Sequence, residues 1–197
     1  MGLYMNKPKT ATPKRWTFPT SPAVNGTFYH GLSNEEYLIL LGTIASTWSR
    51  IEDSMIHIFS DILNIDFHSG VAVRQVYFSI VNARTRIDIM KNALERNPRN
   101  ISKDREYDDI LDKFGALSKR RNDYIHGLWM THESGDVYVV IDSKEEYFLN
   151  GARKIGAEEL KECIKNMNEL QSKIIELINK IINSKLEISM PTNVSSS

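Results

Sequence analysis

Three side chains near position 121 have the types and the spacing that phosphodiester chemistry would use. Arg121, Asn122 and His126 belong to the run RRNDYIHG, which has the pattern of a helix end. Arginine binds phosphate through a planar fork and stays charged at any relevant pH, whereas histidine titrates near neutrality and can move a proton. Asn122 could orient the imidazole or hydrogen-bond the substrate.

These groups could cleave RNA without a metal ion. A base would deprotonate the ribose 2′-hydroxyl, Arg121 would stabilise the charge of the phosphorane, and an acid would protonate the leaving 5′-oxygen. On one helix, Arg121 and His126 are five positions apart, or roughly 140° around the axis, so one helix does not easily aim both at a single point. Two helices packed across a two-fold axis could do so, which predicts a homodimer through this helix.

Structural roles also fit these residues. The apolar spacing that runs from Ile110 to Leu117 continues onto position 121 and predicts that Arg121 lies in line with a core-facing stripe. A charge in such a stripe is costly unless it is paired. Glu52, the lone acid in an apolar row of the first predicted helix, is the candidate partner. His126 could instead be a cation that stabilises the C-terminal end of its helix.

The neighbours of the motif are candidates for supporting roles. Asp123 is expected to be solvated or to polarise His126, and Tyr124 to lie in the core or in an interface. Lys119 and Arg120 form a basic run beside the motif, which either faces solvent or steers an RNA backbone.

Hydrophobic periodicity predicts four long helices that would position these residues, over residues 33–62, 70–97, 102–126 and 157–185. A capping-box pattern of Ser33 and Glu36 marks the start of the first. Its predicted apolar stripe consists of Tyr37, Leu41, Ile44, Trp48, Ile51, Met55, Ile58 and Ile62.

Apolar β-formers on either side of residues 134–136 predict a hairpin, with a third short strand at 147–149. The sequence therefore predicts an all-α protein: an up-down bundle of four long helices with a small β-hairpin, at about 129–149, inserted between helices 3 and 4.

The two ends of the chain differ from the predicted bundle in composition. Residues 1–32 are rich in Pro and Thr and carry four basic residues and no acid, which predicts an extended arm. The arm is either loose until it makes a contact or able to touch phosphate. Residues 33–186 form the predicted helical domain, and residues 187–197 a flexible tail.

Composition argues against several other classes of protein. The formal net charge of the 197-residue chain is zero, so no global field draws it to nucleic acid or to a membrane. Its single cysteine, Cys163, excludes a disulfide framework and is expected to be a buried structural thiol. No paired metal-ligand spacing and no phosphate-binding or dinucleotide-binding glycine loop occurs, so neither a metal nor a cofactor is predicted. No signal peptide or membrane-spanning run is visible, and we expect a cytoplasmic protein.

The pattern Arg121-Asn122-x-x-x-His126 at the end of a bundle helix resembles the signature of HEPN (higher eukaryote and prokaryote nucleotide-binding) domains. The context is similar as well: the first helix carries an aromatic residue and an acid, Trp48 and Glu52, and a short hairpin and a last helix follow the motif. The resemblance extends over the predicted helical domain, although its specific part is six residues long.

This resemblance implies a helical bundle that dimerises through the motif helix. Many HEPN domains are metal-independent endoribonucleases of toxin–antitoxin, CRISPR-linked or phage-defence systems, and others only bind nucleotides or partners. One toxin subgroup has a tyrosine two residues after the histidine, where this chain has Leu128, so the tyrosine-modification control of that subgroup is not expected.

We therefore expect a homodimeric endoribonuclease that acts on RNA, with an antitoxin or regulatory protein as a further candidate partner. The alternative is a non-catalytic, dimeric HEPN-like module that binds a nucleotide or a protein.

Overall fold

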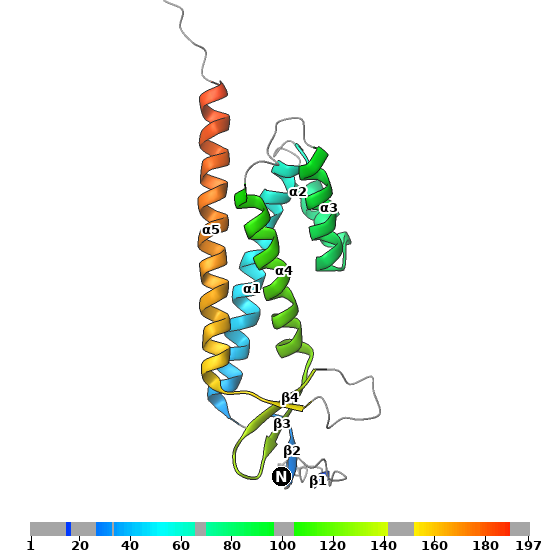
Figure 1. The fold of residues 1–197 in the computed structure, drawn as a ribbon, viewed down its shortest axis with the longest axis vertical. Helices are drawn as coiled ribbons and strands as arrows, with labels where there is room; N and C mark the ends of the chain where they lie inside the picture. The colour runs from blue at the N-terminus through cyan, green and yellow to red at the C-terminus, as the bar shows by residue number, and fades with distance from the viewer. Residues whose placement is uncertain are drawn as a thin grey trace, which may run out of the picture. The chain divides into compact units, whose positions relative to one another are not determined.

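The described part of the chain combines five helices with a five-stranded antiparallel sheet (Figure 1). The predicted all-α bundle of four long helices is therefore wrong, and the chain is α+β. The computed structural model describes residues 15–16, 27–32, 34–65, 70–96, 105–141 and 152–189. The helices are α1 (Glu35–Ile62), α2 (Gly70–Ser79), α3 (Ala83–Arg96), α4 (Arg105–His126) and α5 (Ala157–Ser189), and the strands are β1 (Arg15–Trp16), β2 (Phe28–His30), β3 (Leu128–His132), β4 (Val137–Val140) and β5 (Ala152–Lys154).

Contacts within the chain divide it into two units. The helical unit comprises Ile39–Ile125 and Ala157–Ser197, and the sheet unit comprises Met1–Leu38 and His126–Gly156. None of the described helices is long and apolar enough to cross a membrane. The predicted strand at 147–149, most of the predicted arm and the last eight residues of the predicted tail lie outside the described residues.

Helix α1 follows the predicted apolar stripe. Seven of its eight predicted positions are buried, and Leu41 is half-buried. The helix begins at Glu35, two residues later than predicted. The side chain of Asn34 accepts a hydrogen bond from the backbone N–H of Glu36 (2.9 Å), so Asn34 caps the helix. Ser33 lies outside the described residues.

In the helical unit, α1, α4 and α5 run along one another (Figure 1). The rings of Trp48 and Phe114 stack with their centroids 4.8 Å apart, which joins α1 to α4. The Tyr107 hydroxyl donates to the Asp61 carboxylate (2.8 Å), and Lys185 pairs with the same carboxylate (2.8 Å). These contacts tie all three helices together and compensate the cost of burying Asp61. The predicted end of α4 at residue 126 and the start of α5 at residue 157 are confirmed.

The second predicted helix is in fact two helices, α2 and α3, separated by residues 80–82. The Asn82 side chain accepts a hydrogen bond from the backbone N–H of Arg84 (2.8 Å) and so caps α3. The Nε of Arg86 donates to the carbonyl oxygen of Ile80 (2.6 Å), a group that the break removes from regular helical bonding. Val81, which lies in the break between Ile80 and Asn82, is 90% exposed.

The sheet has the strand order β1-β2-β3-β4-β5, with every neighbouring pair antiparallel. Strands β3 and β4 form the predicted hairpin, with Gly135 in its turn at a φ of 89°. Strand β2 pairs with β3 in the register Phe28↔His132, and β5 pairs with β4. A two-stranded hairpin alone is marginally stable, and all four residues of β4 are buried. The hairpin is therefore part of a larger sheet rather than a small insert in a helical bundle, which is why the predicted fold class fails.

Both faces of the hairpin are covered within the sheet unit. Phe28, Met130, Tyr138 and Val140 form an apolar cluster on one face. On the other face, the ring of Tyr37 lies against Trp129 with centroids 6.4 Å apart, and the Tyr37 hydroxyl donates to the carbonyl oxygen of Ile155 (2.9 Å).

Candidate functional site

The residues of the predicted site lie on the last turns of α4. This helix has acidic residues in its first turn and His126 in its last turn, and both placements suit the helix dipole. The predicted stripe is buried as far as Leu117, and beyond it Arg121 and Ile125 are half-buried. The helix thus carries the motif arginine at the edge of its core-facing side.

Arg121 and Asn122 contact each other directly. The Nη1 of Arg121 donates to the Oδ1 of Asn122 (3.0 Å), so the amide helps to orient the guanidinium. Asn122 and His126 are both exposed and lie one helical turn apart on α4. The boundary between the helical and sheet units falls between Ile125 and His126. Along α4 itself, the five-residue spacing separates Arg121 from His126 by roughly 140°.

Glu52 is not the partner of Arg121. Its Oε1 accepts a hydrogen bond from the Nη1 of Arg86 (2.9 Å), in an ion pair whose Arg86 and Glu52 side chains are 7% and 25% exposed. The expected pairing of Glu52 with Arg121 is therefore wrong. Sequence reasoning missed Arg86, although its spacing carried a signal: Arg86 precedes the buried Met90 and Leu94 by four and eight residues.

Tyr124 fixes the motif helix to α5. Its side chain is fully buried, and its hydroxyl donates to the Oε1 of Glu159 (2.7 Å), an acid in the first turn of α5. This contact gives Tyr124 a positioning role in the core. Glu159 was not predicted as a supporting residue. Asp123, the other expected supporting residue, is half-buried on the adjacent position of α4.

Lys119 and Arg120 differ in their surroundings. Lys119 is exposed, whereas Arg120 is half-buried and lines a cavity of about 250 Å³ between α4 and α5. Cys163 is buried, as expected of a structural thiol. Burial raises the pKa of this thiol, against a lowering effect of the Arg120 charge.

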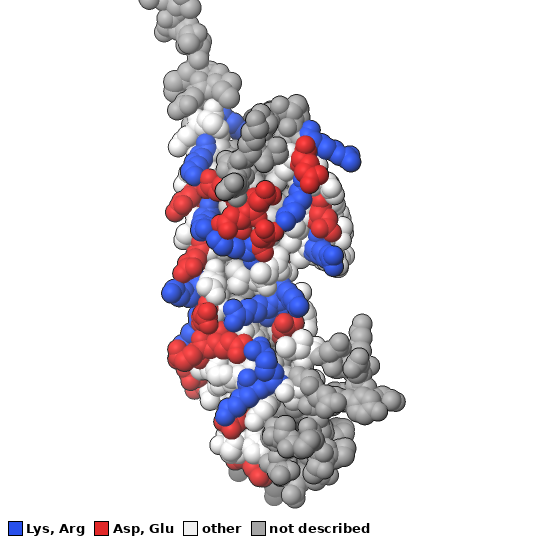
Figure 2. All heavy atoms as spheres, viewed as in Figure 1, with Lys and Arg blue, Asp and Glu red and all other residues white. Residues whose placement is uncertain are grey.

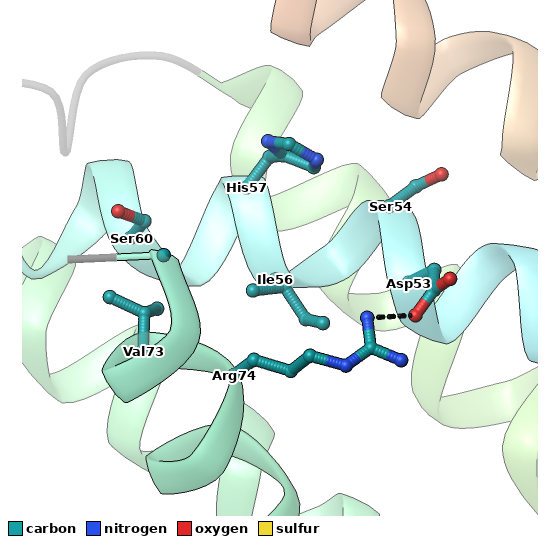
Figure 3. A pocket seen from close by; sticks show the side chains of 8 residues that line it. Asp53, Ser54, Ile56, His57, Ser60, Val73 and Arg74 are labelled. Carbon is teal, nitrogen blue, oxygen red and sulfur yellow. Dashed lines mark hydrogen bonds and ion pairs between the residues drawn. The ribbon is translucent and has the colours of Figure 1, made fainter. Parts of the chain in front are cut away.

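A second cavity, of about 340 Å³, lies between α1 and α2 (Figure 3). Asp53 and His57 of α1 and Arg74 of α2 line it. Arg74 pairs with Asp53 through an N···O distance of 2.6 Å, and its guanidinium lies 5.1 Å from the centroid of the Phe78 ring. The arginine of this cavity is therefore already neutralised by a carboxylate, and no residue of the predicted site lines the cavity.

Metal-binding groups and comparisons with other proteins give no further information about the function of the motif. Within the described ranges, no group of three or more His, Cys, Asp or Glu side chains could hold a metal ion. No protein-family model matches the chain, and neither a curated protein nor a solved structure matches it. The side chains on α4 and their surroundings are therefore the basis for inferring a function.

Proposed function

We propose that the protein is a homodimeric, metal-independent endoribonuclease of the HEPN type, with Arg121, Asn122 and His126 in a composite site. The observation that supports this most is the placement of the motif. Its three residues lie on the last turns of one helix, with Asn122 bound to Arg121 and with Asn122 and His126 exposed. An exposed imidazole can reach a proton on a bound strand, and a guanidinium held by an amide is partly pre-organised for phosphate.

The proposed reaction cleaves the bond between phosphorus and the 5′-oxygen. One His126 accepts the proton of the 2′-hydroxyl, and the 2′-oxygen forms a new bond to phosphorus. Arg121 stabilises the additional negative charge on the phosphoryl oxygens. The P–O5′ bond then breaks, and a protonated His126 of the second copy donates a proton to the 5′-oxygen. The products are a 2′,3′-cyclic phosphate and a 5′-hydroxyl.

The reason for proposing a dimer is the angular separation of Arg121 and His126 on α4. Because Arg121 and His126 diverge on one helix, two copies of α4 related by a two-fold axis would place Arg121 of one copy beside His126 of the other. Lys119, exposed on the same helix, would attract the RNA backbone. The resemblance to HEPN proteins alone suggests a toxin or phage-defence system, with an antitoxin or regulatory protein as partner.

The first test is cleavage of mixed structured and single-stranded RNA by the purified chain in excess EDTA. We expect 2′,3′-cyclic phosphate ends, and loss of cleavage in both Arg121→Ala and His126→Ala. Matched controls are Arg84→Ala and His30→Ala, since both side chains are exposed outside the motif. Both controls should cleave like the unchanged chain.

The second test mixes the unchanged chain with an equal amount of His126→Ala after unfolding and refolding them together. The proposed reaction uses His126 of both copies, so only dimers of two unchanged chains, about one quarter of a random mixture, should stay active. Activity of about one half would exclude a site that needs both copies. A folded dimer in which no RNA is cleaved would overturn the ribonuclease proposal and favour a non-catalytic binding module.

A further inference from the structure

Helices α4 and α5 pack along a common line, here called the seam. Polar contacts join the two helices at both ends of this seam. Tyr124 bonds to Glu159 near the end of α4. Toward the start of α4, Glu106 accepts two hydrogen bonds from Lys180 (2.7 and 3.0 Å), and Asp109 pairs with Lys173 (2.9 Å). The two helices are therefore antiparallel.

The cavity of about 250 Å³ opens between these ties. This volume is several times the roughly 30 Å³ that a water molecule occupies in the liquid. Its polar lining is Lys113 and Arg120 of α4 with Asn166, Glu169 and Lys173 of α5, and leucine and alanine side chains complete the wall.

The charges around this cavity favour an anion. Three cations line it against one acid, Glu169, whose Oε1 lies 3.9 Å from the ammonium of Lys165. Two of these cations, Lys113 and Lys173, share the carboxylate of Asp109, so the positive excess rests on Arg120. Asp109, which is not among the lining residues, accepts hydrogen bonds from Lys113 (2.8 Å) and Lys173 (2.9 Å). These two bonds lower the pKa of the Asp109 carboxyl, with the bond from Lys113 contributing most, so it stays ionised.

Arg120 differs in its pairing from the other two cations that line the cavity. Among the described residues it forms no hydrogen bond and no ion pair, although its side chain is half-buried in the seam. Partial burial of a charge without a partner costs free energy, and a ligand that pairs with it would recover that cost. Arg74 in the other cavity differs, because Asp53 already neutralises it.

The surface as a whole would not attract an anion to this point. Figure 2 shows acidic and basic side chains interleaved over the viewed face, rather than one large basic field. The chain carries 25 basic and 25 acidic residues. Attraction must therefore come from the local excess of positive charge in the cavity, which acts over about 8 to 10 Å at physiological salt.

We propose that this cavity binds a phosphate group, with Arg120 as its main contact and with Lys113 and Lys173 beside it. A guanidinium offers a planar fork to two phosphate oxygens, and the two ammonium groups add point charges. The amide of Asn166 supplies a further donor. The phosphate can belong to an RNA strand or be a free anion. Neither Arg121 nor His126 lines the cavity, so this proposal holds or fails independently of RNA cleavage.

The experiment measures binding of pyrophosphate and of a short single-stranded RNA to the full-length chain, by calorimetry and by fluorescence anisotropy. The test variant is Arg120→Gln, which removes the charge and breaks no hydrogen bond or ion pair among the described residues. Lys173→Gln is the second variant. Arg84→Gln is the matched control, because this arginine lies on α3, is exposed and does not line the cavity.

We expect saturable binding that weakens about tenfold or more in Arg120→Gln, since a charge-assisted contact is lost, and several-fold in Lys173→Gln. Arg84→Gln should bind pyrophosphate like the unchanged chain. Pyrophosphate should also raise the melting temperature of the unchanged chain but not that of Arg120→Gln.

The two ligands distinguish the source of the phosphate. Saturable pyrophosphate binding that is lost in Arg120→Gln supports a site for free anions. Binding of RNA alone, lost in Arg120→Gln and kept in Arg84→Gln, supports a site for the strand backbone. Binding of neither ligand, or binding unchanged in Arg120→Gln, would overturn the proposal.

Discussion

The ion pair between Arg86 and Glu52 gives the sharpest prediction about the fold. Arg86 is 5% exposed and uses its guanidinium three ways: Nη1 binds Glu52 (2.9 Å), Nε binds the carbonyl of Ile80 (2.6 Å), and the cation lies 4.5 Å from the centroid of the Tyr77 ring. One side chain thus joins α1, α2 and α3, and it donates to the Ile80 carbonyl at the break between α2 and α3. We expect Arg86→Ala to be among the most destabilising single changes in the helical unit.

The expected loss of unfolding free energy in Arg86→Ala can be worked out from these contacts. Removing one member of a buried ion pair costs about 3 to 5 kcal/mol, because the other charge stays behind without a partner. The Glu52 side chain is 25% exposed and can regain some hydration, which places the cost at the lower end. The bond to Ile80 and the contact with Tyr77 add roughly 1 to 3 kcal/mol each, but these losses overlap and do not sum. We expect Arg86→Ala to lower the free energy of unfolding by about 3 to 4 kcal/mol.

The assay is urea unfolding followed by circular dichroism, arranged as two double-mutant cycles. Glu52→Ala combined with Arg86→Ala should give a coupling free energy of about 1.5 to 3 kcal/mol. Glu52→Ala combined with Arg121→Ala should give less than about 0.5 kcal/mol, since the Glu52 carboxylate is committed to Arg86. Arg86→Lys keeps a charge but not the planar fork of the guanidinium. Its free energy of unfolding should lie between those of the unchanged chain and Arg86→Ala. A larger coupling in the Arg121 cycle than in the Arg86 cycle would refute the pairing.

Two further predictions concern helical glycines and a buried tyrosine. A Cβ at Gly42 would meet no atom within 4 Å, so Gly42→Ala should raise the free energy of unfolding by about 0.5 to 1 kcal/mol. A Cβ at Gly115 would lie 3.1 Å from the Cδ1 of Ile87, so Gly115→Ala should raise it by less. Equal increases in urea unfolding would contradict this difference. Burial raises the pKa of Tyr77 to about 12 from the ordinary value of 10.0, so its stabilising effect is complete below pH 10 and is lost as the pH rises through 12. Between about pH 9 and about pH 11.5, the unfolding free energy of the unchanged chain should fall by about 2 kcal/mol more than that of Tyr77→Phe, and parallel curves would refute this cause.

Much of the helical unit could be predicted because its periodicity is local. In α1 the steps of three and four residues place large apolar side chains on one side, and seven of the eight predicted positions are buried. The end of α4 at His126 and the start of α5 at Ala157 could be predicted too, since the apolar pattern changes its period there. Such signals need no knowledge of distant contacts.

The break between α2 and α3 could not be predicted from that periodicity. Ile80 is apolar and continues the helical pattern, and the pattern resumes at Ala83, yet Val81 in the break is 90% exposed. The break depends on the Asn82 cap and on the bond from Arg86 to the Ile80 carbonyl. The cap was readable in the sequence, because asparagine is a favoured N-cap residue. The Arg86 contact also requires Glu52 in another helix, and no local pattern shows that pairing.

The number of strands in the sheet could not be predicted, for a related reason. Its hairpin is local and was predicted, but the partner strand β2 lies far from β3 in sequence, with Phe28 opposite His132. Pairing over such a separation depends on tertiary contacts, and the Pro-rich surroundings of β2 argued for an irregular arm. The burial of all four residues in β4 shows what the alternating pattern could not show by itself, that both faces of the hairpin are covered.

The position of Arg86 also changes how a loss of function at Arg121 should be interpreted. If Arg121 held Glu52, replacing it would disrupt the junction with α1, and lost cleavage would follow from lost structure. Arg86 carries that ion pair instead, and the Nη1 of Arg121 binds the amide of the adjacent Asn122. Tyr124, through Glu159, holds the motif helix on α5. An Arg121→Ala variant that keeps the unfolding free energy of the unchanged chain but loses cleavage would therefore place the defect in the chemistry on phosphate.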